Sequence, residues 1–178
     1  NNVDEKNDTG KTVLSIAVEK NNLPLVEYLI NDCQSDITTI DNQKNTLLHI
    51  ALFNESYDVL QYLLSLKTVN INNANIYGIT PLHISVMKGN FDIFCALLKY
   101  NACPLILDTK GRSIINFSIK SNSFIIFDYI IQNKLTYPFP IDKNQATPFH
   151  YAAACPDTRF LTALASLDSS LINDKKCG

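Results

Sequence analysis

One short pattern recurs along this chain at an almost constant spacing, and it constrains the fold more than any other feature. A hydroxyl residue followed by apolar and polar residues occurs at Thr12, Thr46, Thr80, Ser113 and Thr147. The steps between them are 34, 34, 33 and 34 residues. A period in this range is typical of repeat architectures, in which each repeat buries its apolar face against its neighbours. The sequence therefore predicts five similar repeats rather than a single globular core.

Each repeat carries the same turn and helix signals around its hydroxyl residue. The hydroxyl is expected to cap a short helix, and Pro81 and Pro148 follow it at the first helical position in two repeats. Gly lies two residues before the hydroxyl in three repeats, whereas Lys44 and Gln145 take this place in the others and predict looser turns. An Asn or Asp five residues before the hydroxyl is expected to start a turn, because its side chain can accept hydrogen bonds from the backbone ahead. These turn-starting residues are Asn7, Asp41, Asn75, Asp108 and Asp142.

A second helix is expected in each of the first four repeats after a short break. Apolar residues at positions i, i+1, i+4 and i+5 form one helix face over residues 25–30, 59–64, 91–98 and 126–131. Small residues at positions 17, 51, 85, 118 and 152 let the two helices approach closely. The chain has only five Gly, so Asn is expected to take some of the left-handed turn positions. Each repeat is thus predicted to contain a turn, two helices and an extended link.

The segment Thr80-Pro81-Leu82-His83 and its counterparts resemble the start of an ankyrin repeat. The same period fits tetratricopeptide repeats, but those begin with a Trp-containing pattern and this chain has no Trp. The resemblance covers residues 7–174 and implies an all-α fold, an ankyrin-repeat solenoid of stacked helix-turn-helix units with β-hairpin-like links. The fourth repeat is degenerate, and Pro156 stands where a Gly is usual in the fifth. We expect a single domain over residues 1–178, part of a longer chain, with repeats at 7–40, 41–74, 75–107, 108–141 and 142–174 and a truncated sixth beginning at 175–178.

Stacking implies two sets of buried apolar side chains, one on the first helices and one on the second helices. Equivalent positions share a chemical type in every repeat, which indicates a common role in the core. The first set is Leu14, Leu48, Leu82, Ile115 and Phe149, and the second set is Leu29, Leu63, Leu97 and Ile130.

The three histidines are the side chains that most suggest a metal or catalytic site. His49, His83 and His150 all lie three residues after the hydroxyl, so their rings are expected about one repeat apart, too far to share one ion. An imidazole at this position is predicted to bond backbone groups of an adjacent turn. Ser15 and Asn116 take the same position in two other repeats and are polar as well. We therefore predict a structural role for this position.

Other catalytic or nucleotide-binding patterns are incomplete. Residues 9–12 end like a phosphate-binding loop, but that loop needs a Gly at position 5, which is Glu5, and a preceding apolar strand. Cys155 follows His150 by five residues and lies off the same helix face, which argues against a nucleophile–base pair. We predict no enzymatic activity, no metal site and no cofactor.

Composition narrows the partners and the compartment. The net charge of −2 argues against a broad basic face for nucleic acid. No apolar run reaches the roughly 18 residues that cross a bilayer, and the first seven residues are too polar for a signal peptide. Five Cys without a CxxC motif indicate reduced thiols. We expect a cytoplasmic protein (in the host cytosol if it is a pathogen effector) that binds neither nucleic acid nor a membrane.

The resemblance implies that function lies on a concave surface made of loop tips and first helices, which binds a partner protein or peptide. The family positions lie four, three and one residues before the hydroxyl and seven and eight after it. In repeats one and two they are Asp8, Thr9, Lys11, Glu19, Lys20, Asn42, Gln43, Asn45, Phe53 and Asn54. Repeat three is apolar there and repeat four is basic, which favours an interaction hot spot with adjacent charge. The predicted partner-binding residues are Phe53, Ile76, Tyr77, Ile79, Met87, Lys88, Lys110, Arg112 and Lys120.

Three alternatives stay open at this point. Phe53 and Ile76 could simply pack under neighbouring loops. Lys110, Arg112, Lys120 and Tyr77 could instead grip an anionic or nucleotide-like small molecule that regulates a separate effector domain. The link 135–140 carries two aromatic residues and two prolines, for which packing against repeat four is preferred over partner binding.

Overall fold

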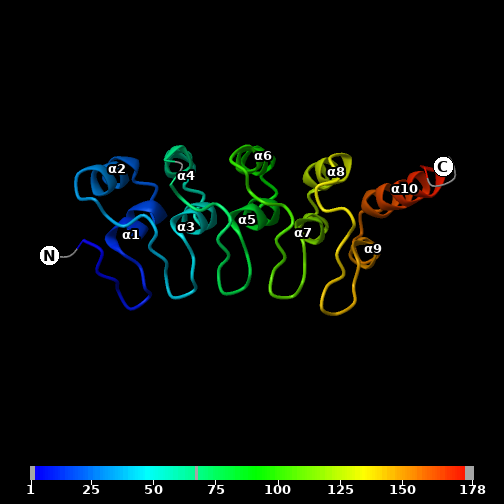
Figure 1. Ribbon diagram of the computed structural model, residues 1–178, viewed down its shortest axis with the longest axis horizontal. Coiled ribbons are helices and arrows are strands. Elements are labelled where there is room, and N and C mark those ends of the chain that lie inside the picture. Colours follow the sequence, from blue (N-terminus) through cyan, green and yellow to red (C-terminus); the bar gives the residue numbers. More distant parts are fainter. Residues whose placement is uncertain (1–2, 67, 175–178) are drawn as a thin grey trace. The chain divides into compact units, whose positions relative to one another are not determined.

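The described part of the chain folds into pairs of short helices joined by loops (Figure 1). The computed structural model describes residues 3–66 and 68–174, with side chains as far as residue 167. The expected start of a sixth repeat at 175–178 lies outside the described residues. The helices are α1 (Val13–Glu19), α2 (Leu23–Asn31), α3 (Leu47–Phe53), α4 (Tyr57–Ser65), α5 (Pro81–Met87), α6 (Phe91–Lys99), α7 (Ile114–Lys120), α8 (Phe124–Gln132), α9 (Pro148–Ala153) and α10 (Arg159–Asp174).

The chain divides into two compact units, and the division runs through the third repeat. The first compact unit comprises Asn1–Ile84 and Ala96–Cys103, and the second comprises Ser85–Cys95 and Pro104–Gly178. Within the first, the loops project from the side of α1 and α3, while α2 and α4 lie on the other side of these helices (Figure 1). The single five-repeat domain stays a prediction of the sequence.

Each first helix begins directly after its hydroxyl residue, as the sequence predicts. Thr12, Thr46, Ser113 and Thr147 occupy the N-cap positions of α1, α3, α7 and α9. In each cap the hydroxyl accepts from the backbone N–H three residues on, and the side chain of that residue accepts from the backbone N–H of the cap. This reciprocal arrangement satisfies two backbone donors that the first turn of a helix leaves unpaired.

One side-chain oxygen closes the loop in front of each first helix. Oδ1 of Asp41 accepts hydrogen bonds from the backbone N–H groups of Gln43 and Asn45, both at 2.8 Å. Asn7, Asn75, Asp108 and Asp142 accept the equivalent pair in their own loops. All five turn-starting residues therefore act as predicted.

The expectation of looser turns at Lys44 and Gln145 is wrong. Their φ angles are 59° and 62°, in the same left-handed region as Gly10 at 77°. The N–H of Lys44 donates to Asp41 O at 2.9 Å, as that of Gly10 does to Asn7 O at 2.8 Å. The side-chain hydrogen bonds hold the turn in one shape even where a residue with a Cβ must adopt a strained backbone conformation.

The break between the two helices of a repeat also uses the left-handed conformation. Asn21, Glu55, Gly89 and Asn122 have φ angles between 51° and 65° at this position. Pro156 stands there in the fifth repeat, and its ring fixes φ near −65°. The break between α9 and α10 is five residues long, against three in the other repeats, and Oδ1 of Asp157 accepts from the N–H of Arg159 at 3.0 Å where α10 begins.

The core follows the two sets of apolar positions with one exception. The side chains of Leu14, Leu48, Leu82 and Ile115 are at most 1% exposed, and those of Leu29, Leu63, Leu97 and Ile130 at most 4%. Phe149 is only half-buried, so its expected place in the core is wrong. Among the described residues no helix pair follows α9 and α10 to cover that side of α9.

The side chain three residues after the hydroxyl bonds to the next loop in the second repeat but not in the fourth. In the first compact unit, Nδ1 of His49 accepts from the N–H of Thr46 at 3.2 Å, and Nε2 donates to Ile79 O in the next loop at 2.8 Å. In the second, Oδ1 of Asn116 accepts from the N–H of Ser113 at 3.0 Å, but its buried Nδ2 has no partner among the described residues. The predicted bond to an adjacent turn is thus confirmed for His49, and an Asn side chain is too short to make it.

Replacing Gly10 by Ala should destabilise the protein, whereas Lys44→Ala should not. A Cβ on Gly10 would lie 2.4 Å from Oδ1 and 2.7 Å from N of Asn42. We expect Gly10→Ala to lower the free energy of unfolding by about 2–4 kcal/mol. Lys44 is exposed and already carries a Cβ, so Lys44→Ala should change it by less than about 0.5 kcal/mol. Equal losses in urea denaturation would contradict this loop geometry.

Two substitutions at the position three residues after the hydroxyl, His49→Asn and Asn116→His, should change the free energy of unfolding in opposite directions. His49→Asn keeps an acceptor for Thr46 but loses the bond to Ile79 O, so we expect a loss of about 1–3 kcal/mol. Asn116→His should gain about 1 kcal/mol, because we expect the ring to reach Ala146 O as His49 reaches its counterpart, Ile79 O. Thermal and urea denaturation of both variants measure the two changes. A shift of both variants in the same direction would show that the bond between loops is not what this position contributes.

Stability should also fall as the pH is lowered through the range in which histidine titrates. Burial lowers the pKa of His49, with Ile79 O and the Asp41 carboxylate opposing the shift. The unfolded chain therefore binds more protons below about pH 6.5, and the contribution of neutral His49 is complete above that pH. We expect a loss of up to about 1.4 kcal/mol per pH unit below it. The slope of unfolding free energy against pH should be smaller in His49→Asn, and an unchanged slope would contradict this assignment.

Candidate partner-binding surface

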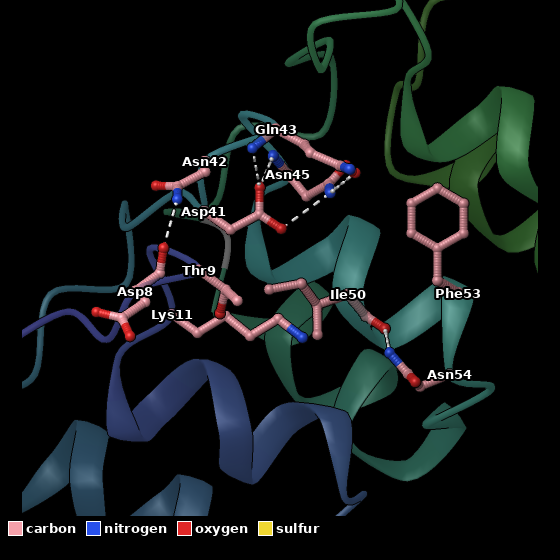
Figure 2. Close-up of a pocket in the computed structure, with 10 residues that line it drawn as sticks. All are labelled: Asp8, Thr9, Lys11, Asp41, Asn42, Gln43, Asn45, Ile50, Phe53 and Asn54. Atoms are coloured by element: carbon pink, nitrogen blue, oxygen red, sulfur yellow. Dashed lines mark hydrogen bonds between the residues drawn. The ribbon is translucent and has the colours of Figure 1, made fainter.

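A hollow of about 460 Å³ lies on the side of the first compact unit formed by loop tips and first helices, here called the loop-side face (Figure 2). Its walls are the loops of repeats one and two, and its third side is the end of α3. Eight of the ten lining residues stand at the surface positions expected from the sequence, and Asp41 and Ile50 are the two that were not expected. The lining residues are Asp8, Thr9, Lys11, Asp41, Asn42, Gln43, Asn45, Ile50, Phe53 and Asn54.

Hydrogen bonds between neighbouring loops fix the walls of this hollow. The backbone N–H of Asn42 donates to Thr9 O at 3.1 Å, and its Nδ2 donates to Asp8 O at 2.8 Å. Oδ2 of Asp41 accepts from Nδ2 of Asn45 at 2.9 Å, and Oδ1 of Asn45 accepts from Nδ2 of Asn75 in the third loop at 2.9 Å. The three loops are therefore ordered before any partner arrives.

The one lysine in the hollow is already paired. Nζ of Lys11 donates to Oε2 of Glu19 at 2.5 Å, and Nζ of Lys20 lies 3.7 Å from Oε1 of the same carboxylate. The hydrogen bond from Lys11 is the main cause that lowers the pKa of Glu19. Asp8, in contrast, is exposed, and its carboxylate has no hydrogen-bond partner among the described residues.

The predicted partner-binding residues of the first compact unit divide into exposed and buried side chains. Phe53, Ile76 and Tyr77 are 41%, 44% and 53% exposed. Ile79 is only 8% exposed, so the expectation that it faces a partner is wrong. The position just before the hydroxyl lies at the base of the loop, where Asn45 is also buried. Of the residues predicted as binding, only Phe53 lines the hollow.

The remaining predicted residues lie in the second compact unit, and most of them are exposed. Met87 is 45% exposed, and Lys88, Lys110 and Lys120 are exposed as well. Arg112 differs because its Nε and Nη2 donate to Oδ2 of Asp108 at 2.8 and 2.6 Å.

The guanidinium of Arg112 also lies 4.6 Å from the centre of the Phe117 ring. The positive charge of Arg112 is therefore used within its own loop and is not offered to a ligand.

A second hollow of about 390 Å³, in the second compact unit, contains Lys120, Tyr151 and Cys155. The hydroxyl of Tyr151 donates to Oδ2 of Asp142 at 2.6 Å. Burial, followed by this hydrogen bond, raises the pKa of Tyr151 to about 12, and the same bond is the main cause that lowers the pKa of Asp142. Sγ of Cys155 lies 3.8 Å from Oδ1 of Asn122. Tyr151 thus ties a helix to its loop.

The link at residues 135–140 is partly packed and partly open. Thr136 is buried, whereas Tyr137 is 46% exposed and packs edge-on against Phe139, with ring centres 5.6 Å apart. The packing preferred from the sequence therefore accounts for only part of this segment.

Metal and membrane features are absent from the described residues. No three His, Cys, Asp or Glu side chains gather there as a metal site would require, and the cysteines described, Cys33, Cys95, Cys103 and Cys155, are free thiols. None of the helices described is both long and apolar enough to cross a membrane.

Comparison with known families agrees with the repeat pattern. A family model for ankyrin repeats in three copies matches residues 1–75, and one for a single ankyrin repeat matches residues 77–109. A comparison with curated protein sequences found no match. Ankyrin repeats are generally protein–protein interaction modules and are typically not enzymes. Together with the helix pairs that continue the same loop geometry to residue 174, these matches establish that the chain is an all-α repeat solenoid and belongs to the ankyrin repeat family.

Proposed function

We propose that the chain is a non-catalytic module that binds a partner protein or peptide on a concave face formed by its loops and first helices. The observation that carries this proposal is the exposure of Phe53, Ile76 and Tyr77 beside a polar hollow in the first compact unit. Large apolar side chains next to polar groups are typical of interaction hot spots. The backbone N–H of Ile76 donates to Gln43 O at 3.0 Å, which places the third loop beside the hollow.

The order of the loops supports binding without a large entropic cost. Each loop is closed by two hydrogen bonds to one side chain, and the loops of the first compact unit are bonded to one another. A surface that is already ordered loses little conformational freedom when a partner binds. The cysteines in the described part of the chain are free thiols, which agrees with a reducing compartment such as the cytoplasm.

The alternative, an anionic or nucleotide-like ligand, has less support. Arg112, one of the cations that would grip such a ligand, is held by Asp108 and lies over Phe117. Enzymatic activity has no support either, because Nδ1 of His150 pairs with Thr147 and the thiol of Cys155 contacts Asn122 and Ile119.

Polar substitution on the loop-side face tests the proposed function. Binders are selected from a displayed peptide library, and their Kd values are measured by calorimetry against the wild type and Tyr77→Ser. We expect Kd to rise at least about tenfold, which is about 1.4 kcal/mol. Tyr28→Ser is the matched control, because Tyr28 is 56% exposed on α2, away from the loops.

Binders whose affinity survives Tyr77→Ser, in a variant with unchanged helical circular dichroism, would overturn this assignment. An equal loss in Tyr28→Ser would also contradict it.

A further inference from the structure

We propose that the hollow of the first compact unit receives a basic side chain, lysine or arginine, from the bound partner segment. This inference rests on the proposed function and names the chemistry that one part of the face recognises. Its basis is an excess of hydrogen-bond acceptors over donors in the hollow, together with an unpaired carboxylate at the rim.

The orientation of Asn42 follows from its partner. Asp8 O is a backbone carbonyl and can only accept, so the group that faces it at 2.8 Å must be the amide NH₂ of Asn42. Its Oδ1 lies on the side of Gly10, where an added Cβ would be 2.4 Å away, and has no hydrogen-bond partner among the described residues. Asn54 is fixed in the same way, because its Nδ2 donates to Ile50 O at 2.8 Å and leaves Oδ1 as a free acceptor.

The remaining groups of the hollow add further acceptors. The Asp8 carboxylate is unpaired among the described residues, and Oδ2 of Asp41 accepts only one hydrogen bond, from Asn45. The hydroxyl of Thr9 donates to Oδ1 of Asn7 at 2.7 Å, so its oxygen can only accept from a ligand. The donors that remain are the amide of Gln43 and the ammonium group of Lys11.

The charges of the lining residues also favour a cation as the ligand. Among the lining residues, Asp8 and Asp41 carry negative charge, and Lys11 carries the only positive charge. Because Glu19 neutralises Lys11 at 2.5 Å, the net field of the hollow is negative. An anionic group would meet two carboxylates and a lysine whose charge is already paired with Glu19, whereas an ammonium or guanidinium group would find several unused acceptors.

The layout shown in Figure 2 gives the position of the basic head group. Asp8 and the amide oxygen of Asn42 lie at one end of the view, and the Phe53 ring lies at the other. We place the charged group of the partner at the Asp8 end and its apolar neighbours toward Phe53, which is 41% exposed. The volume of about 460 Å³ holds such a side chain with part of its backbone.

The test is a selection of random displayed peptides on the immobilised chain. Wild type should enrich Lys or Arg at one fixed position of the consensus, and Asp8→Lys should replace it with Asp or Glu. Asp32→Lys is the matched control, because Asp32 is an exposed carboxylate at the C-cap of α2. This control should leave the consensus unchanged.

A selected peptide is then resynthesised with citrulline, the neutral isostere, in place of its arginine. Wild type should bind the citrulline peptide about tenfold more weakly, and Asp8→Asn should bind both peptides alike. The inference is overturned if basic residues are not enriched, or if Asp8→Lys and Asp32→Lys change the consensus equally. Binding that still depends on Tyr77 would in that case leave the proposed function standing. If no selected peptide depends on Tyr77, the proposed function itself fails.

Discussion

The structure depends on one side-chain oxygen in each loop. This oxygen accepts hydrogen bonds from two backbone N–H groups and thereby fixes the turn before each first helix. In the second repeat Oδ1 of Asp41 does this for Gln43 and Asn45, and Thr46 then caps α3. The turn keeps its shape even where Lys44 must adopt a positive φ. Because the loops form the face on which binding is proposed, the interaction that builds the fold also orders the candidate site.

Most of the fold could be predicted from the sequence because its signals act over a few residues. The bond from Asp41 spans two to four residues and the cap at Thr46 spans three, so residue type and spacing determine both. The predictions at Lys44 and Gln145 were wrong because the hydrogen bonds accepted by Asp41 and Asp142 hold the turn without a Gly. The prediction at Phe149 was wrong because its burial depends on a further helix pair covering α9, which a local pattern does not contain.

The candidate site was less predictable, because side-chain chemistry does not show which groups are already used. Arg112 and Ile79 were assigned to the surface by their position, yet Arg112 is held by Asp108 and Ile79 is buried at the base of its loop. Apolar character drew attention to repeat three, whereas the hollow of the first compact unit has mainly polar walls from two successive loops. Its residues stood at the expected family positions, but their unused hydrogen-bonding capacity became visible only in the structure.

Native-state hydrogen exchange tests the central claim most directly, since it reports the protection of each loop amide. The account predicts that the amides of Gln43 and Asn45 exchange about as slowly as that of Ile50 in the first turn of α3, which donates to Thr46 O at 3.0 Å. The counterparts of these two amides in the other loops should behave alike. The account would be contradicted if the loop amides exchanged as fast as those of an unfolded chain while the helix amides stayed protected.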